Sequence, residues 1–159
     1  MSYVQELRKV VGHRPLILPG AVVVLTDEKK QILLQKRKEP EGLWGIPGGL
    51  MEPGESLENT VKRELFEETN LQVDKLSLVG VFSGNSFFRK LQNGDQFYSV
   101  TIVYTSKHFK GNLEISDDES MELRFFKYNE IPSNLIASHK EILNSLGICK
   151  KFNGFKSCI

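Results

Sequence analysis

The sequence predicts an α/β (α+β) fold, with a mixed β-sheet sandwiched between α-helices. Strand-like apolar segments lie both before and after one central amphipathic stretch, residues 57–69. The dipeptide Asn93-Gly94 separates two alternating segments, which is the pattern of a β-hairpin. A further helix-like stretch follows Pro132. Elements in this order are expected to pack as layers, because each one has an apolar face to bury.

The first elements are predicted to be a short helix and two strands. Apolar residues at helical spacing within residues 1–14 indicate an amphipathic N-terminal extension. Residues 17–28 predict a strand and residues 31–38 its partner, with the polar "DEKK" as the hairpin turn between them. Residues 39–55 contain five glycines and three prolines, which favour a long shaped loop over a periodic element.

The central helix is predicted over residues 57–69, with recognisable signals at both ends. Ser56 is a good N-cap residue, and Asn70 stands where a left-handed C-cap residue belongs. The expected buried stripe recurs at every fourth position and consists of Leu57, Val61 and Leu65.

The second half of the chain is rich in predicted strands. Residues 76–82 form one, residues 86–107 form a hairpin, and residues 121–128 form another. Residues 133–146 predict the C-terminal helix. The remaining tail, 147–159, is expected to be frayed or to serve as an interaction segment.

Composition bounds the class of protein. No repeat or linker divides the 159 residues, so one domain over residues 1–159 is expected. Hydrophobic content of 40% and charged content of 26% are globular values, and a net charge of +1 makes a nucleic-acid partner unexpected. No membrane span or signal peptide is evident. With two peripheral cysteines, Cys149 and Cys158, a cytoplasmic protein is expected; the alternative is a C-terminal disulfide clasp.

Three glutamates within residues 57–69 raise the question of function. Glu64, Glu67 and Glu68 have helical i, i+3, i+4 spacing, at which like charges repel. On a helical wheel, Glu64 and Glu68 lie within roughly 20 to 60° of the buried stripe, and Glu67 lies just beyond. Since Arg63 alone cannot neutralise three partly buried carboxylates, a divalent cation is indicated, and oxygen ligands suit Mg²⁺ or Mn²⁺. The alternative is a solvated acidic helix face.

The surrounding spacing points to a family. In "GLMEPGESLENTVKRELFEETNL", the matching positions are Gly49, Glu55, Arg63, Glu64, Leu65, Glu67, Glu68 and Leu71. This string resembles the Nudix hydrolase box, whose final glycine is replaced here by Asn70. At ordinary residue frequencies, such a match has a chance probability on the order of 10⁻⁸ per starting point. With the segments on either side, the resemblance extends over residues 16–146.

The resemblance implies the Nudix fold, with the box as a loop–helix–loop, and a metal-dependent chemistry. By it, Glu64, Glu67 and Glu68, with the Gly48 carbonyl, would hold Mg²⁺ or Mn²⁺. Glu64, Glu67 and Arg63 are the candidate catalytic residues within the box. Glu55 and Gly49 would support them, with Glu55 pairing with Arg63 to orient the ligands.

Residues outside the box complete the predicted site. Glu119 is the candidate for an additional ligand or general base, although it could equally belong to a solvated acidic loop. Arg37, at the end of a strand, is a candidate phosphate-binding residue, although it could equally be a solvated strand end. Trp44 and the pair Phe87/Phe88 could stack on a base or simply pack in the protein. The three histidines have no metal-ligand spacing and receive no role.

The predicted function is hydrolysis of the phosphoanhydride bond in a nucleoside diphosphate linked to another moiety. ADP-ribose or another nucleotide sugar is the first substrate expected, and an oxidised or non-canonical nucleoside triphosphate the second. The alternatives are a non-catalytic Nudix-like ligand sensor and a purely structural or Ca²⁺-buffering acidic helix. A homodimer is also expected, from the family and from the prevalence of two-fold assemblies.

Overall fold

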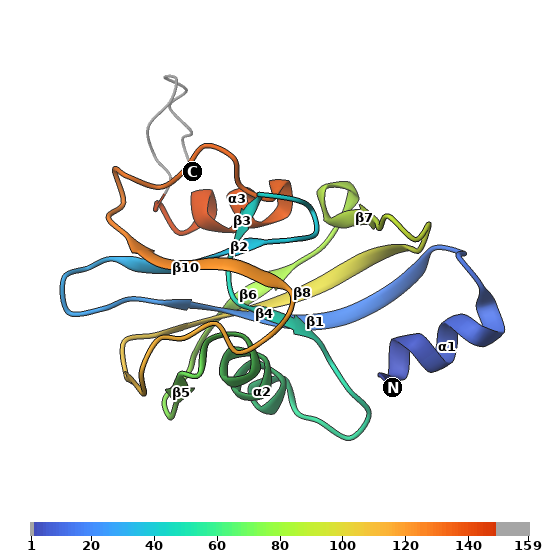
Figure 1. Ribbon diagram of the computed structural model, residues 1–159, viewed down its shortest axis with the longest axis horizontal. Coiled ribbons are helices and arrows are strands. Elements are labelled where there is room, and N and C mark those ends of the chain that lie inside the picture. Colours follow the sequence, from blue (N-terminus) through green and yellow to red (C-terminus); the bar gives the residue numbers. More distant parts are fainter. Residues whose placement is uncertain (1, 149–159) are drawn as a thin grey trace.

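The computed structural model describes residues 2–148 and has the predicted mixed α and β class (Figure 1). Its helices are α1 (Tyr3–Val11), α2 (Leu57–Thr69) and α3 (Ala137–Ser145), with one 3₁₀ turn, η1 (Asn85–Phe87). Its strands are β1 (Leu16–Leu25), β2 (Ile32–Arg37), β3 (Trp44–Gly45), β4 (Gly48–Leu50), β5 (Gln72–Val73), β6 (Ser77–Phe82), β7 (Phe88–Lys90), β8 (Gln96–Ser106), β9 (Phe109–Lys110) and β10 (Ser120–Phe126). No helix within these residues is long and apolar enough to cross a membrane.

The strands form two main sheets and one small one. The largest has the order β4-β1-β8-β6, with β7 also pairing with β8, and it is mixed because β1 and β8 run parallel. The second has the order β10-β2-β3, and β5 pairs with β9. Figure 1 shows α3 covering one side of the strands and α2 the other. The prediction of a mixed sheet between helices is therefore confirmed.

The central strands bury both faces, which explains their nearly continuous apolar sequences. Val22 and Val24 of β1 belong to the core beneath α3, whereas Val23 and Leu25 belong to the core beneath α2. Strand β2 alternates in the same way between the two cores. Strand β1 is thus packed between two apolar layers, one on each of its faces.

The predicted pairing of the first two strands is wrong. Strand β1 pairs with β4 on one side and β8 on the other, while β2 pairs with β10 and β3. Within the described residues, a single isolated β-bridge, between Thr26 and Ile32, joins the two segments. It lies next to a turn in which the Asp27 side chain accepts a hydrogen bond from the Gln31 amide. The local turn was recognisable, but β8 and β4 satisfy both edges of β1 and leave no ladder for β2.

Helix α2 begins and ends at the predicted residues. The Ser56 hydroxyl accepts a hydrogen bond from the Asn59 amide at 3.2 Å. Asn70 adopts the left-handed conformation, with φ 60° and ψ 14°, and its amide donates to the Phe66 carbonyl. Val61 and Leu65 are fully buried. The substitution of Asn for the last box glycine therefore preserves the helix end, because Asn tolerates this conformation.

Two other expectations need correction. The glycine-rich segment 39–55 is not one irregular loop, since it contains β3 and β4. Helix α3 begins at Ala137 rather than near residue 133, because the preceding chain pairs with Trp44, whose carbonyl accepts from the Ile136 amide at 2.9 Å.

Trp44 and Phe87 are buried in the core, so neither offers a face for stacking. Cys149 and Cys158 lie outside the described residues.

Candidate active site

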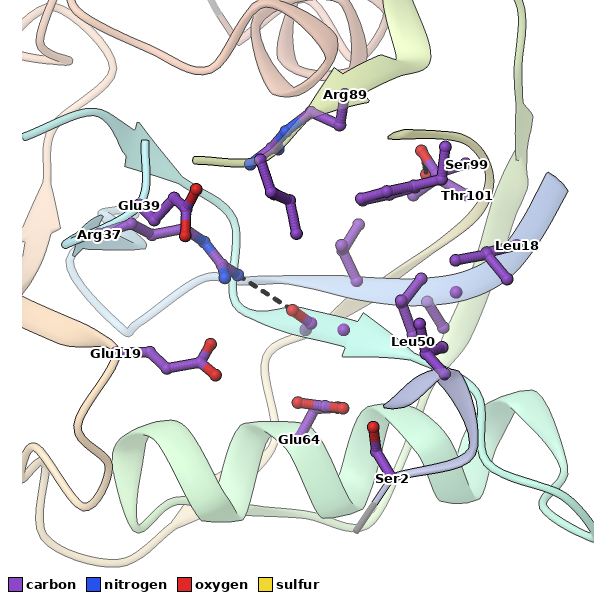
Figure 2. A pocket seen from close by; sticks show the side chains of 18 of the residues that line it. Ser2, Leu18, Arg37, Glu39, Leu50, Glu64, Arg89, Ser99, Thr101 and Glu119 are labelled. Atoms are coloured by element: carbon purple, nitrogen blue, oxygen red, sulfur yellow. Dashed lines mark hydrogen bonds between the residues drawn. The ribbon is translucent and has the colours of Figure 1, made fainter. Parts of the chain in front are cut away.

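A cavity of about 570 Å³ opens where α2, β1, β4 and the β7–β8 hairpin meet. Figure 2 shows charged side chains at one end, with Glu64 and Glu119 facing each other across the space and Arg37 above them. Leu18 and Leu50, together with Ser99 and Thr101, lie at the other end. Because β4 and α2 bracket the charged end, the box glutamates and the glycine strand meet there.

Glu68 is the most buried of the three box glutamates, with 5% of its side chain exposed. Its carboxylate accepts a hydrogen bond from the Gly48 amide at 2.8 Å and another from Arg37 Nη2 at 3.2 Å. Burial raises the pKa of Glu68 to about 7, even though the Arg37 charge and the Gly48 amide act in the opposite direction. This carboxylate is therefore short of compensating positive charge.

Glu64 lines the same cavity, with 18% of its side chain exposed. One carboxylate oxygen accepts a hydrogen bond from Arg63 Nη1 at 2.8 Å. Burial raises the pKa of Glu64, partly opposed by Arg63. Gly49 makes room for this group, because a Cβ atom at that position would lie 2.5 Å from the Glu64 carboxyl carbon. A side chain at position 49 would therefore force the Glu64 carboxylate to move from its present place.

Glu67 lies apart from the other two, with 54% of its side chain exposed. It accepts a hydrogen bond from Arg63 Nη1 at 3.0 Å and does not line the cavity. Exposure increases from Glu68 to Glu64 to Glu67, in agreement with the expectation that Glu67 lies furthest from the buried stripe. The structure therefore brings Glu64 and Glu68 together, and a ligand role for Glu67 stays a prediction.

Arg63 connects the helix to the preceding loop. Its Nε and Nη2 donate to the two oxygens of Glu55, at 2.6 and 3.1 Å, and Nη2 also reaches the Leu50 carbonyl at 3.1 Å. Glu55 is held further by the Glu52 amide and the Thr60 hydroxyl. The Arg63 guanidinium lowers the pKa of Glu55 to about 2. The pair thereby fixes Glu64 and the end of β4 relative to each other.

This pair gives a prediction for acid stability. The folded-state pKa of Glu55, about 2, is below its ordinary 4.5, so its contribution is complete above pH 4.5 and is lost as the pH falls through 2. We expect Glu55→Gln to lower the free energy of unfolding by about 2 kcal/mol at pH 7. The difference from wild type should shrink between pH 4.5 and 2 in urea titrations. Glu130→Gln removes an exposed carboxylate and should leave the free energy of unfolding almost unchanged. Equal losses of stability in the two variants would contradict the role of Glu55.

Arg37 is hydrogen-bonded to two of the predicted metal ligands, the Gly48 carbonyl and Glu68. Its Nη2 donates to the Gly48 carbonyl at 3.0 Å and to Glu68 at 3.2 Å. No three His, Cys, Asp or Glu side chains within residues 2–148 come close enough together to hold a metal ion. The donor types nevertheless fit Mg²⁺ or Mn²⁺, because Glu64, Glu68 and the Gly48 carbonyl offer only oxygens.

Glu119 also lines the charged end of the cavity. It precedes β10, and its carbonyl accepts a hydrogen bond from the Lys38 amide at 2.9 Å. Asp117 caps the turn by accepting hydrogen bonds from the amides of Glu119 and Ser120. Glu119 thus lines the cavity from an exposed loop, and its chemical role stays a prediction.

Two basic side chains of the cavity, Arg89 and His139, have no assigned role from the sequence. Arg89 makes no ion pair within residues 2–148, and its pKa is lowered by burial and by the nearby Arg37 charge. The His139 Nδ1 accepts a hydrogen bond from the Ile46 amide at 2.8 Å, and burial lowers the pKa of His139 to about 3. Arg89, which has no ion-pair partner in the described part of the chain, is a cation that could meet an anion, and His139 is a neutral packing residue. Neither position carries a spacing signal in the sequence.

Comparison with known proteins identifies the family of this chain. A family model described as NUDIX domain matches residues 17–146. A relative from Methanocaldococcus jannaschii, named "ADP-ribose pyrophosphatase", is 30% identical over 139 residues, covering 86% of this chain and 78% of the relative. A relative from Bacillus subtilis, named "Putative 8-oxo-dGTP diphosphatase", is 43% identical over 125 residues, covering 79% and 76%.

Solved structures share the fold. The crystal structure of a MutT NUDIX hydrolase from Burkholderia pseudomallei superposes with a TM-score of 0.68 at 26% identity, covering 80% of this chain and 96% of that one. The NUDIX domain of Shewanella oneidensis NrtR has a TM-score of 0.64 at 23% identity, covering 92% and 97%. With the family match spanning most of its length, the chain belongs to the Nudix hydrolases and is a pyrophosphohydrolase of that family.

Proposed function

We propose that this chain is a Mg²⁺- or Mn²⁺-dependent enzyme that cleaves the phosphoanhydride bond of a nucleoside diphosphate linked to another moiety. The observation that carries the proposal is a pair of carboxylates, the buried Glu68 and the half-buried Glu64, which line the same cavity as Arg37 and Arg89. Carboxylates suit a hard cation, and guanidinium groups suit phosphate oxygens. The charged end of the cavity therefore has complementary groups for a metal-bound diphosphate.

The residues of the chain have distinct tasks in this proposal. Glu64, Glu68 and the Gly48 carbonyl would hold the cation, which would supply charge neutralisation and a water of lowered pKa. Arg63 and Glu55 keep the Glu64 carboxylate in place through their mutual hydrogen bonds. Arg37 and Arg89 would bind phosphoryl oxygens, where charge develops in the transition state.

Glu119 is proposed as the residue that accepts the proton of the attacking water. Its position supports this, since it faces Glu64 across the cavity (Figure 2). If it has this role, Glu119→Gln should lower kcat by about 10²–10⁴-fold in steady-state assays at saturating Mg²⁺.

Two substrate classes are supported by the named relatives. The Methanocaldococcus jannaschii relative is named for ADP-ribose, our first candidate, and the 43%-identical Bacillus subtilis relative is named for 8-oxo-dGTP, our second. A panel of ADP-ribose, other nucleotide sugars, 8-oxo-dGTP and unmodified nucleoside triphosphates, assayed with and without Mg²⁺, tests the proposal. Metal-dependent turnover of at least one class is expected. Metal-independent turnover, or none across the panel, would contradict it.

A ligand sensor without catalysis is disfavoured because the chain retains all the box glutamates. The homodimer and the cytoplasmic location remain predictions. Measuring the molar mass in solution by light scattering would determine the first.

A further inference from the structure

The cavity has a second end, away from the carboxylates, and helix α1 forms part of its wall. The helix lies outside the matched residues 17–146. Figure 2 shows this end on the side of Leu18, Leu50 and Ser99, with Ser2 approaching from α1. The cavity is lined here by Ser2, Val4, Leu18, Leu50, Phe97 and Ser99, and the charged Arg8 of α1 and Glu52 beyond β4 line the cavity as well.

Helix α1 is fastened at both ends. At its start, the Ser2 hydroxyl accepts from the Gln5 amide, and the Tyr3 amide donates to Glu52 at 3.0 Å, just beyond β4. At its end, Arg8 has only 9% of its side chain exposed, and its Nη2 donates to the Gln96 carbonyl at 2.6 Å, at the start of β8. The helix thus bridges from β4 to β8, and its position relative to the cavity is fixed by charged hydrogen bonds.

The chemistry of this end differs from that of the charged end. Val4, Leu18 and Leu50 offer aliphatic surfaces, and the half-buried Phe97 offers an aromatic one. The Ser99 hydroxyl accepts a hydrogen bond from Thr101 Oγ1 at 3.1 Å, which leaves its own proton for an acceptor on a ligand. Apolar walls with an aromatic ring and a few hydrogen-bonding groups suit a flat heteroaromatic ring.

Building on the proposed function, we propose that this end is the subsite for the nucleobase and that α1 determines how tightly a base binds there. A diphosphate at Arg37 and Arg89 would direct the attached nucleoside along the cavity toward Val4 and Phe97. The volume of about 570 Å³ is sufficient for such a ligand. Val4 and Phe97 are then the residues that determine specificity.

The test measures binding without hydrolysis. The full chain and its Val4→Trp and Val10→Trp variants are titrated calorimetrically with AMP, GMP and ribose 5-phosphate in the presence of a chelator. Val4 lines the cavity, whereas Val10, on the same helix, is 85% exposed and serves as the matched control. Wild type and Val10→Trp should bind at least one nucleotide about tenfold more tightly than ribose 5-phosphate. Val4→Trp should lose that preference and keep its affinity for ribose 5-phosphate.

The proposal is overturned if wild type binds neither nucleotide more tightly than ribose 5-phosphate, or if both tryptophan variants behave like wild type. Thermal unfolding of the two variants checks that Val4→Trp is folded. If Val4→Trp is unfolded, Phe97→Leu replaces it in the titrations. Phe97→Leu should also lose the preference for a nucleotide over ribose 5-phosphate. Because the readout needs neither metal nor turnover, absence of hydrolysis would disprove the proposed function while leaving this result interpretable.

Discussion

Replacing Glu64 with Gln is expected to lower kcat for metal-dependent phosphoanhydride hydrolysis by about 10²–10⁴-fold. The substitution keeps the shape of the side chain but removes the negative charge that faces the cavity. It also weakens the hydrogen bond from Arg63, which still retains its two contacts with Glu55. Stability should therefore change little compared with activity. Steady-state phosphate release at saturating Mg²⁺, together with urea unfolding, measures both effects.

Glu58→Gln is the matched control for this experiment. Glu58 lies on the same helix, but its carboxylate accepts a hydrogen bond from the Tyr104 hydroxyl at 2.9 Å and does not line the cavity. We expect its kcat to stay within about twofold of wild type, as for a surface change away from the site. If Glu64→Gln retained full activity, or if Glu58→Gln lost as much, the proposed role of Glu64 would be wrong.

The second large effect expected is on stability, from Gly48→Ala. Gly48 has φ +137°, and a Cβ atom there would lie 2.2 Å from the Ala21 carbonyl oxygen and 2.7 Å from Val22 Cα. Both atoms are backbone of β1, so the two strands would have to separate. We expect a loss of about 3 kcal/mol or more in the free energy of unfolding, from strain and overpacking together. Activity should also fall, because the Gly48 amide and carbonyl both face the site.

Gly54→Ala separates the two causes of the stability loss, backbone strain and overpacking. Gly54 also has a positive φ, +86°, but nothing lies within 4 Å of a Cβ atom at that position. Its substitution should cost only about 1–2 kcal/mol, the conformational part. Denaturant titrations of both variants measure the difference. Equal losses would contradict the close approach of β4 to β1.

The sequence specified the central helix well because its signals are local. Ser56 and Asn70 set its two ends, and the apolar stripe set its buried face, so the box glutamates could be placed from spacing alone. The Asn93-Gly94 signal was likewise sufficient to predict the β7–β8 hairpin, which the structure contains, although residues 92–94 form a three-residue loop in which the Leu91 amide donates to the Asp95 carbonyl. These features depend only on neighbouring residues and backbone preferences.

Features that depend on distant parts of the chain were not predictable in the same way. Strand β1 pairs with β8, some eighty residues later in the chain, and nothing in the turn after β1 indicates that β2 would pair elsewhere. Arg89 and His139 reach the cavity only because β7 and α3 pack against its walls. A lone arginine in a strand or a lone histidine in a helix carries no spacing signal, so their positions emerge only from tertiary structure.

The most direct test of a metal site at Glu64 and Glu68 is an anomalous difference map from crystals of the full chain soaked in Mn²⁺. We predict a peak in contact with both carboxylates and the Gly48 carbonyl, with the Arg37 guanidinium displaced from that carbonyl, where it now donates at 3.0 Å. A peak found only at other carboxylates, such as Asp117 and Asp118, or no peak at saturating Mn²⁺, would contradict the proposed site.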